Sequence, residues 1–229
     1  SLKSDLPREI VEQNANPQNV ENQRVMTVTT RIKIGLEKKC RDKLLALSGS
    51  ATPSVKWDAS SGVTIKKNVD AAKKIFRAQN GGIDPNTIVI PYDVAVVMSN
   101  DPDVLARDKR TTNDQQTSGQ ILPDQLFGMK VVIAGAMNKA TPAASFTNIW
   151  STDDVFLLYV DPTTSASGGD VLTFGAQFRA PARAGVPIWV TKWADPDPTT
   201  NKDWYAMEVN QDENFISDTC ALRMSDVLT

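Results

Sequence analysis

A regular hydrophobic stripe predicts one long helix in the first part of the chain. Apolar residues recur at every fourth position, at Val28, Ile32, Leu36, Cys40 and Leu44. This spacing is typical of the buried face of an α-helix, and we predict that the helix runs from Arg24 to Leu47. Gly49 follows as a C-terminal stop signal. With a rise of about 1.5 Å per residue, such a helix would be roughly 36 Å long.

The middle of the chain combines helix signals with short apolar runs. A second helix is predicted to begin at Asn68, a good N-cap, and to end at Gly81-Gly82. The β-branched run 87–90 is typical of a buried strand, and Pro91 can begin another helix over residues 92–98. The same patterns predict a helical turn after Pro102, a short helix from Pro123 to Phe127, and strands over 131–134 and 155–160.

The last third of the chain is rich in strand patterns. Apolar residues alternate from Leu172 to Phe178, and this alternation predicts a strand. The ranges 187–193 and 204–209 are separated by a stretch rich in Asp, Pro and Thr, so they are interpreted as a long hairpin. A final strand is predicted over 220–224. Helices followed by strands, with no internal repeat, predict an α+β fold.

Two segments carry too few apolar residues to form a core. Residues 1–22 are rich in Asn, Gln, Glu and Pro, and we expect an extended arm. Residues 107–120 contain no large apolar side chain, which predicts a long exposed loop. The basic run Arg107, Lys109 and Arg110 begins this loop. Because its neighbours are acidic and amidic, we interpret the run as a solvated or intersubunit loop in preference to a nucleic-acid site.

Composition excludes many kinds of catalytic chemistry. The 229 residues include no histidine and two cysteines, and the net charge is −2. Without histidine there is no Ser-His-Asp triad, no Cys-His pair and no histidine-containing zinc site. The low net charge gives no basic footprint for nucleic acid and no polybasic membrane patch. An enzyme would have to rely on carboxylates, lysine or tyrosine, and we expect Cys40 and Cys220 to be buried free thiols.

Three acidic or glycine-rich spots leave alternatives open. Asp153 and Asp154 are adjacent and could chelate a cation, act as an acid–base pair or form a polar turn before a strand. Asp195 and Asp197 flank a proline and could bind calcium or form the tip of the hairpin. Gly168-Gly169 is interpreted as a linker, because the chain has no phosphate-binding glycine motif. We favour the structural reading in each case and predict no catalytic residue, no metal and no cofactor.

The tryptophans carry the most distinctive signal. Trp189, Trp193 and Trp204 all fall on the predicted hairpin. They could form a core or a half-buried sheet face within one chain. A narrow hairpin covers three such side chains with difficulty, so contact with another subunit is the competing interpretation. We therefore take the three tryptophans, together with Arg107, Lys109 and Arg110, as the candidate subunit interface.

The order of several motifs resembles the major capsid proteins of tailed bacteriophages, whose fold is shared with encapsulin shells. The resemblance covers about residues 24–229, and its motifs are the segments DAAKKIFRAQNGGIDPNTIVIPYDVAVVMSNDPDVLARDKR, LFGMKVVIAGAMNKA, NIWSTDDVFLLYVDP and TFGAQFRA. It implies a phage capsid fold with a long spine helix, a peripheral domain built on a long β-hairpin, and a mixed α/β axial domain.

The resemblance also implies a division of the chain. Residues 23–62 and 161–212 would form the peripheral domain, and residues 63–160 and 213–229 the axial domain. Residues 1–22 would be an extended arm or the end of the family's extended loop, with the rest of that loop upstream of Ser1.

The expected function is that of a structural protein. Copies of the chain would associate as hexamers and pentamers into the icosahedral capsid of a tailed phage or prophage, assembled in the bacterial cytoplasm around double-stranded DNA. Scaffold, portal or decoration proteins would be further partners, the DNA would be non-specific cargo, and no membrane would be involved. The alternatives are an encapsulin-like compartment shell and a histidine-free enzyme that uses carboxylates.

Overall fold

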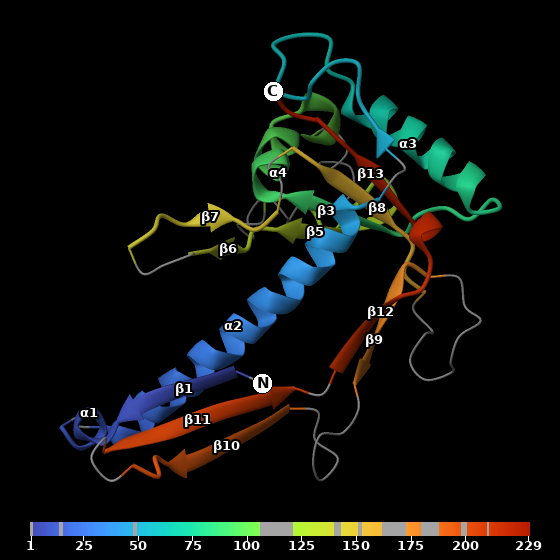
Figure 1. Cartoon of the computed structure of the whole chain (residues 1–229). Coiled ribbons are helices and arrows are strands. Elements are labelled where there is room, and N and C mark those ends of the chain that lie inside the picture. Colours follow the sequence, from blue (N-terminus) through green and yellow to red (C-terminus); the bar gives the residue numbers. More distant parts are fainter. Residues whose placement is uncertain are drawn as a thin grey trace. The chain divides into compact units, whose positions relative to one another are not determined.

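The chain divides into two compact units. The computed structural model describes residues 2–13, 16–47, 50–105, 121–139, 143–150, 153–161, 173–179, 188–197, 201–209 and 211–229 (Figure 1). Unit 1 comprises Ser1–Lys39 and Gln177–Asn214, and unit 2 comprises Cys40–Ala176 and Phe215–Thr229. Residues 40–62 and 161–176, which the predicted division places in the peripheral domain, thus fall in unit 2. The names peripheral and axial stay predictions.

Unit 1 is a small antiparallel sheet with helices. Strands β1 (Leu2–Pro7), β11 (Lys202–Val209) and β10 (Ile188–Ala194) lie side by side in that order. The short helix α1 (Arg8–Glu12) follows β1 directly. Strands β10 and β11 confirm the predicted hairpin, with Ile188 opposite Val209 and Ala194 opposite Asp203.

The expectation that residues 1–22 form an extended arm is wrong. Residues 2–7 form β1, which pairs with β11 from Leu2 opposite Met207 to Pro7 opposite Lys202. Leu6 is only 2% exposed, so this segment contributes to the core of unit 1. Composition misled here because a single edge strand needs few apolar residues, and its partner strand lies about 200 residues away in the sequence.

The long helix begins seven residues before the predicted start. Helix α2 runs over Pro17–Leu45. Pro17 takes the first helical position, where its missing N–H costs nothing. Asn16 caps the helix, because its side-chain Oδ1 accepts a hydrogen bond from the backbone N–H of Asn19 at 3.3 Å. The predicted stop at Gly49 lies outside the described residues.

Unit 2 is built on a mixed sheet of six strands. Their order is β2 (Ser50–Ala51), β13 (Ala221–Met224), β8 (Val155–Leu158), β3 (Thr87–Pro91), β5 (Met129–Ala134) and β4 (Gln125–Leu126). Strand β3 runs parallel to β5 and antiparallel to β8. Helices α3 (Ile65–Gln79) and α4 (Tyr92–Ser99) supply the remaining large elements.

The core of unit 2 lies between one face of this sheet and both helices. Alternate strand residues such as Ile88, Leu157 and Leu222 pack with Phe76 of α3 and Met98 of α4, and all five are fully buried. Helix α3 shows the regular spacing expected of an amphipathic helix, with Ile65, Val69, Ala72 and Phe76 as its buried residues. The predicted strands β3, β5, β8 and β13 are confirmed within one to two residues at each end.

The predicted helix from Pro123 to Phe127 is wrong. Residues 125–126 form β4, which pairs with β5 through Leu126 opposite Met129. Phe127 has φ 55° and Gly128 has φ 75°, so a tight turn of two left-handed residues connects the strands. Phenylalanine rarely adopts this conformation, so the residue types at 127 and 128 do not predict a hairpin turn.

Several smaller elements complete the chain. Strands β6 (Met137–Asn138) and β7 (Thr147–Asn148) pair with each other, as do β9 (Gly175–Arg179) and β12 (Gln211–Phe215). The sequence predicted neither β12 nor the β6–β7 pair, and it placed the start of β9 too early, at Leu172, which lies outside the described residues. A short 3-10 helix over Asp218–Cys220 precedes β13. Neither Cys40 nor Cys220 forms a disulfide, and Cys220 is buried as expected, but Cys40 is partly exposed, so the expectation of burial is wrong for Cys40.

Candidate functional site

The predicted tryptophan surface lies on the three-stranded sheet of unit 1. Trp193 of β10 stands opposite Trp204 of β11, and Trp204 stands opposite Asp5 of β1. Residues directly opposite each other in antiparallel strands share a face. Trp193 and Trp204 are therefore neighbours on one face of the sheet, and both are partly exposed. We call the side of the sheet that carries Trp193 and Trp204 the tryptophan face.

The opposite face of the sheet is the one that contacts α2. The hydroxyl of Thr29 lies 3.3 Å from the sulfur of Met207, and Glu21 pairs with Lys192. Successive side chains of a strand point to opposite faces of the sheet. Met207 is three residues after Trp204 on β11, and Lys192 is next to Trp193 on β10, so both lie on the face opposite the two tryptophans. Tyr205 and Met207 are 4% exposed on this covered side. Within the described residues, α2 thus covers one face of the sheet and leaves the tryptophan face without a helix.

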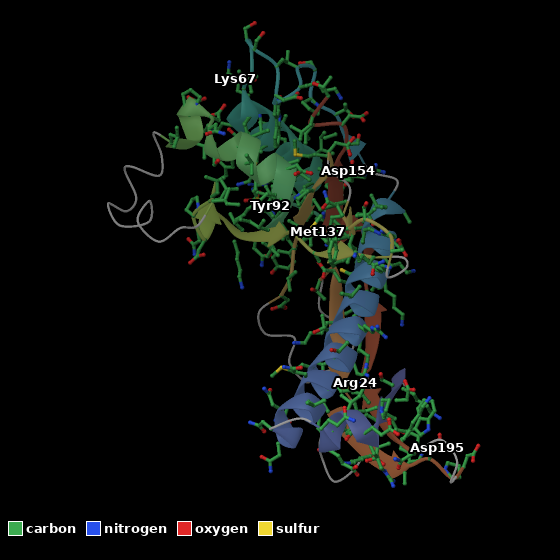
Figure 2. All side chains as sticks on the ribbon, turned by 90° about the vertical axis from the view of Figure 1, so that its left-hand side faces the viewer. Arg24, Lys67, Tyr92, Met137, Asp154 and Asp195 are labelled. Atoms are coloured by element: carbon green, nitrogen blue, oxygen red, sulfur yellow. The ribbon has the colours of Figure 1, made fainter. Side chains whose placement is uncertain are left out.

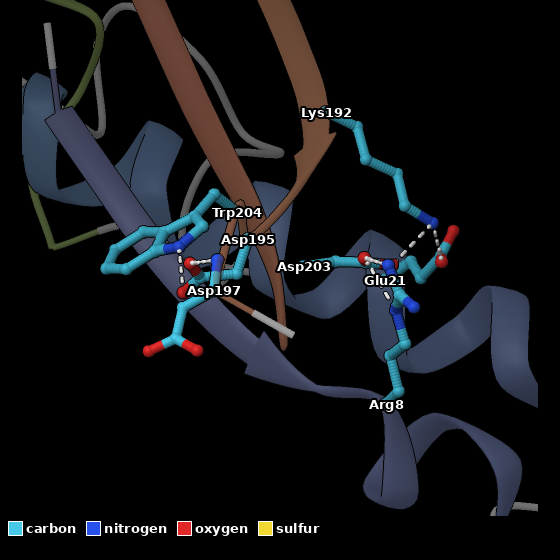
Figure 3. A network of polar contacts seen from close by, with 7 residues as sticks. All are labelled: Arg8, Glu21, Lys192, Asp195, Asp197, Asp203 and Trp204. Atoms are coloured by element: carbon cyan, nitrogen blue, oxygen red, sulfur yellow. Dashed lines mark hydrogen bonds and ion pairs between the residues drawn. The ribbon is translucent and has the colours of Figure 1, made fainter. Parts of the chain in front are cut away.

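Polar contacts fix both indole rings. The Nε1–H of Trp204 donates a hydrogen bond of 2.9 Å to the Oδ2 of Asp195 (Figure 3). The other oxygen of Asp195 accepts a hydrogen bond of 3.0 Å from the backbone N–H of Asp197. The ammonium of Lys3 lies 5.5 Å from the centre of the Trp193 ring, which is cation–π range. Asp195 and Asp197 therefore serve the hairpin tip, and their geometry supports the structural reading over a calcium site.

A second polar network joins four segments of unit 1. Asp203 pairs with Arg8 at 2.9 Å and with Lys192 at 3.4 Å, and Lys192 pairs with Glu21 at 2.6 Å (Figure 3). The hydrogen bond from Lys192 lowers the pKa of Glu21 and raises that of Lys192. Burial raises the pKa of Asp203, but hydrogen bonds from Arg8 and Lys192 outweigh it, so the net shift is downward.

Tyr205 lies beside this network without completing it. Its ring centre is 5.5 Å from the Lys192 ammonium. Its buried hydroxyl has no hydrogen bond of good geometry among the described residues, although it is near enough to Glu21 to affect the pKa of that carboxyl. Burial raises the pKa of Tyr205 itself. Sequence reasoning missed this network because its members lie up to 195 residues apart.

The remaining predicted interface residues lie outside this description. Arg107, Lys109 and Arg110 belong to residues 106–120, which the structure does not describe. The backbone of Trp189 lies in β10 opposite Glu208, but its side chain is likewise outside the described part. The structure therefore brings together Trp193 and Trp204 from the predicted set and leaves the other four untested.

Asp154, one of the two adjacent acidic residues of unit 2, has a structural partner. Asp154 is 2% exposed, and its two oxygens accept hydrogen bonds from Arg223 at 3.0 and 2.9 Å. Arg223 also donates to the backbone oxygen of Leu45 at 3.4 Å. Both carboxylate oxygens of Asp154 are thus engaged by one guanidinium, in a bidentate ion pair. Among the described residues, no group of three or more histidine, cysteine, aspartate or glutamate side chains could hold a metal ion.

One open hollow of about 520 Å³ lies in unit 2, lined by Trp57, Asp58, Val63, Val97 and Asp101 among others. Both carboxylates already have structural partners. Asp58 accepts hydrogen bonds from the backbone and hydroxyl of Thr229, and Asp101 accepts them from the backbone N–H groups of Asp103 and Val104. The Nε1 of Trp57 is buried and has no partner among the described residues. The hollow does not bring free acid and base groups together.

Three large apolar or aromatic side chains of unit 2 are also exposed. Tyr92 at the start of α4, Met137 of β6 and Phe146 before β7 are 50%, 48% and 62% exposed. Tyr92 and Met137 are labelled in Figure 2. The Lys139 ammonium lies 4.8 Å from the centre of the Phe146 ring. Large exposed apolar side chains of this kind are typical of surfaces that contact another protein.

No helix among the described residues is both long and apolar enough to cross a membrane.

Comparison with solved structures finds similar folds. A phage-related protein from Bordetella bronchiseptica is 19% identical with a TM-score of 0.69, covering 99% of this chain and 74% of that one. The capsid of cyanophage P-SCSP1u is 12% identical with a TM-score of 0.56, covering 100% and 72%. The encapsulin of a holo complex from Synechococcus elongatus is 10% identical with a TM-score of 0.54, covering 99% and 72%.

The sequence comparisons give no such match. No protein-family model matches the chain, and no curated protein matches it significantly. The match in three dimensions extends over nearly the whole chain and is shared by phage capsids and an encapsulin. The chain therefore has the α+β phage capsid fold, as the sequence motifs predicted.

Proposed function

From this fold we propose that the protein is the major capsid protein of a tailed phage or prophage, and that its copies form an icosahedral shell around double-stranded DNA. The observation that carries the proposal is a match to capsid structures over nearly the full length of the chain. A fold alone does not fix a function. The side chains support it, because the acidic residues that an enzyme would need are engaged in structural contacts.

The tryptophan face is the subunit contact that we propose in unit 1. Tryptophan is enriched at the centres of protein interfaces, where a large ring excludes water and its N–H finds a partner. Here Asp195 holds the Trp204 ring in place before any partner arrives, which lowers the entropy lost on contact. Trp189, Arg107, Lys109 and Arg110 stay in the proposed interface on sequence grounds alone.

Electron microscopy of the purified protein tests the proposal. Closed particles, or sheets and rings of regular subunits, are expected from the wild type. Changing Trp193 and Trp204 to alanine should reduce assembly at least tenfold while leaving the monomer folded by circular dichroism. Ile75, which is 41% exposed on α3, serves as a control, and Ile75→Ala should assemble normally. A folded wild type that stays monomeric under all conditions would argue against a shell protein.

An encapsulin-like compartment is the second candidate, because the encapsulin match covers as much of the chain as the phage matches do. The two candidates differ in what the shell encloses. Particles purified from the native host would contain nucleic acid in one case and a protein cargo in the other. The ratio of absorbance at 260 nm to that at 280 nm, followed by mass spectrometry of the contents, separates them.

The proposal also covers partners and location. We propose that subunits associate as hexamers and pentamers, with scaffold, portal or decoration proteins as further partners. Assembly would take place in the host cytoplasm, and the mature protein would lie in the virion. We further propose that the protein is not an enzyme and that it needs no cofactor.

A further inference from the structure

Helix α2 carries a surplus of positive charge that the chain as a whole conceals. The chain has a net charge of −2. Its 29-residue helix α2 nevertheless holds seven basic and three acidic residues. The basic residues are Arg24, Arg31, Lys33, Lys38, Lys39, Arg41 and Lys43. The prediction that the chain has no basic footprint rested on the net charge of the whole chain, and it therefore missed the strongly basic helix α2.

Among the described residues, most of this positive charge has no ion-pair partner. The acidic residues Glu21 and Asp42 pair with Lys192 and Arg41. The Lys43 ammonium lies 5.6 Å from the centre of the Phe215 ring. In the described part of the chain, no hydrogen bond or ion pair involves the side chains of five α2 cations, namely Arg24, Arg31, Lys33, Lys38 and Lys39.

Helix α3 shows that such a surplus is not a general property of the fold. It is basic as well, but Lys66 pairs with Asp70, Arg77 pairs with Asp84, and Lys73 donates to the backbone oxygen of Phe127. Only Lys67 and Lys74 of α3 lack a partner among the described residues. The uncompensated charge is therefore concentrated on α2.

Three of the α2 cations form a regular row. Arg24, Arg31 and Lys38 are spaced seven residues apart. Seven residues make almost two helical turns, so the three side chains leave the helix on nearly the same side, about 10.5 Å apart along its axis. Arg31 is exposed, and Arg24, labelled in Figure 2, and Lys38 are partly exposed. All three belong to unit 1.

A glycine lies in this row, between Arg31 and Lys38. Gly35 is exposed in the interior of α2, where glycine is less favourable than alanine because it loses more backbone entropy on folding. A Cβ atom at this position would meet nothing within 4 Å. Packing among the described residues therefore does not require a glycine. Absence of a side chain beside two cations lets another molecule's backbone come close to the helix.

We propose that the row formed by Arg24, Arg31, Gly35 and Lys38, here called the basic row, binds the phosphate backbone of double-stranded nucleic acid. The inference rests on the proposed shell function, because the helix would need nucleic acid enclosed beside it. Unpaired cations at regular spacing, with no aromatic or large apolar residue in the row, suit phosphates better than a protein partner, whose interfaces are depleted of lysine and need an apolar centre. Contacts of this kind are independent of base sequence.

Salt dependence gives the proposal a quantitative test. Each neutralised phosphate releases counterions, so the slope of log K against log salt concentration is about −0.9 per contact. Three contacts predict that the basic row accounts for about 2.7 of the total slope. The full chain is titrated with a fluorescently labelled duplex of mixed sequence at several salt concentrations, and binding is followed by anisotropy.

The matched variants differ only in where three charges are removed. The test variant is Arg24→Gln, Arg31→Gln and Lys38→Gln. The control is Lys67→Gln, Lys74→Gln and Lys130→Gln, which removes three exposed lysines of unit 2 that lack partners among the described residues. The test variant should lose at least tenfold in affinity at low salt and nearly all of the row's slope, and the control should lose less than threefold. Equal losses in both variants, or a wild type that does not bind the duplex, would overturn the proposal.

Substitutions of Gly35 separate binding from folding. Gly35→Ala should raise the melting temperature and keep affinity within about twofold of the wild type. Gly35→Leu should also leave the helix folded, but its bulk should reduce affinity several-fold. Unchanged affinity in Gly35→Leu would remove the close approach from the proposal, and with it the role of the row as a phosphate cradle.

Assembly is measured separately on the same proteins. The basic-row variant should still form shells by electron microscopy, with less nucleic acid inside. If its shells contain as much nucleic acid as the wild type, the inference is wrong and the shell function stands. If the wild type stays monomeric under all conditions, the proposed function fails independently of the duplex titration. If the wild type binds an acidic peptide but not the duplex, and the basic-row variant loses that binding, the row belongs to a protein partner instead.

Discussion

The two units of this protein are stabilised in different ways. Unit 2 has a core in which a six-stranded sheet packs against two helices, and its largest side chains are fully buried. Unit 1 has a three-stranded sheet with one face on α2, and ion pairs join its segments. On the other face of this sheet the rings of Trp193 and Trp204 stay partly exposed. The difference teaches that unit 2 carries its stability within one chain, whereas unit 1 is suited to gain stability from neighbouring molecules.

The largest effect is expected in the core of unit 2. Phe76→Ala removes a fully buried ring from α3 and should destabilise unit 2 by about 3–5 kcal/mol. Chemical denaturation followed by circular dichroism measures the change. The neighbouring variant Ile75→Ala, on the exposed side of the same helix, should cost less than about 0.5 kcal/mol. A similar cost for both variants would show that the core is not organised as described.

The next largest effect concerns the buried ion pair. Arg223→Ala leaves the 2%-exposed Asp154 without its partner, and a buried charge without a partner costs about 3 kcal/mol or more. The double variant Arg223→Ala with Asp154→Ala should recover part of this loss, because no charge then stays buried. If the double variant is less stable than Arg223→Ala alone, the pair is not the cause of the loss.

The sequence predicted the elements whose signals are local. The period of four in α2, the β-branched run of β3 and the alternation in β10 and β11 each specify an element without knowledge of its partner. Elements that exist only through pairing were missed. Strand β1 is held by a strand about 200 residues away, and β12 by β9.

The candidate site shows the same division. The tryptophans stand out by residue type and fall on a hairpin that the turn residues predict, so Trp193 and Trp204 were found together. The bond from Trp204 to Asp195 and the network around Lys192 depend on register and on long-range packing, which no local pattern reveals. The basic row was visible in the sequence as a period of seven, but net charge concealed it.

A smaller effect is expected at the tip of unit 1. Trp204→Phe keeps the ring but removes the N–H that donates to Asp195, which should cost about 1 kcal/mol in unit 1. Limited proteolysis and hydrogen exchange of β10 and β11 report on unit 1 separately from unit 2. Protection of unit 2 amides should not change. Loss of protection in both units would mean that they unfold together, which contradicts the comparison above.

The smallest effect, and the most selective, is the response of unit 1 to acid. Glu21 and Asp203 both have pKa values lowered in the folded protein, chiefly through hydrogen bonds from Lys192 and Arg8. A group whose pKa is lower when folded contributes stability above its unfolded pKa and loses it as the pH falls through its folded pKa. Unit 1 should therefore weaken as the pH falls below the ordinary values of 4.5 for Glu21 and 3.8 for Asp203. Because these pairs are partly exposed, the effect should be below about 1 kcal/mol.

Lys192→Met should flatten this pH dependence, measured by hydrogen exchange of β10 and β11. The control Lys67→Met, on α3, should leave it unchanged, because Lys67 has no partner among the described residues. An unaltered acid response in Lys192→Met would show that the network does not hold unit 1 together.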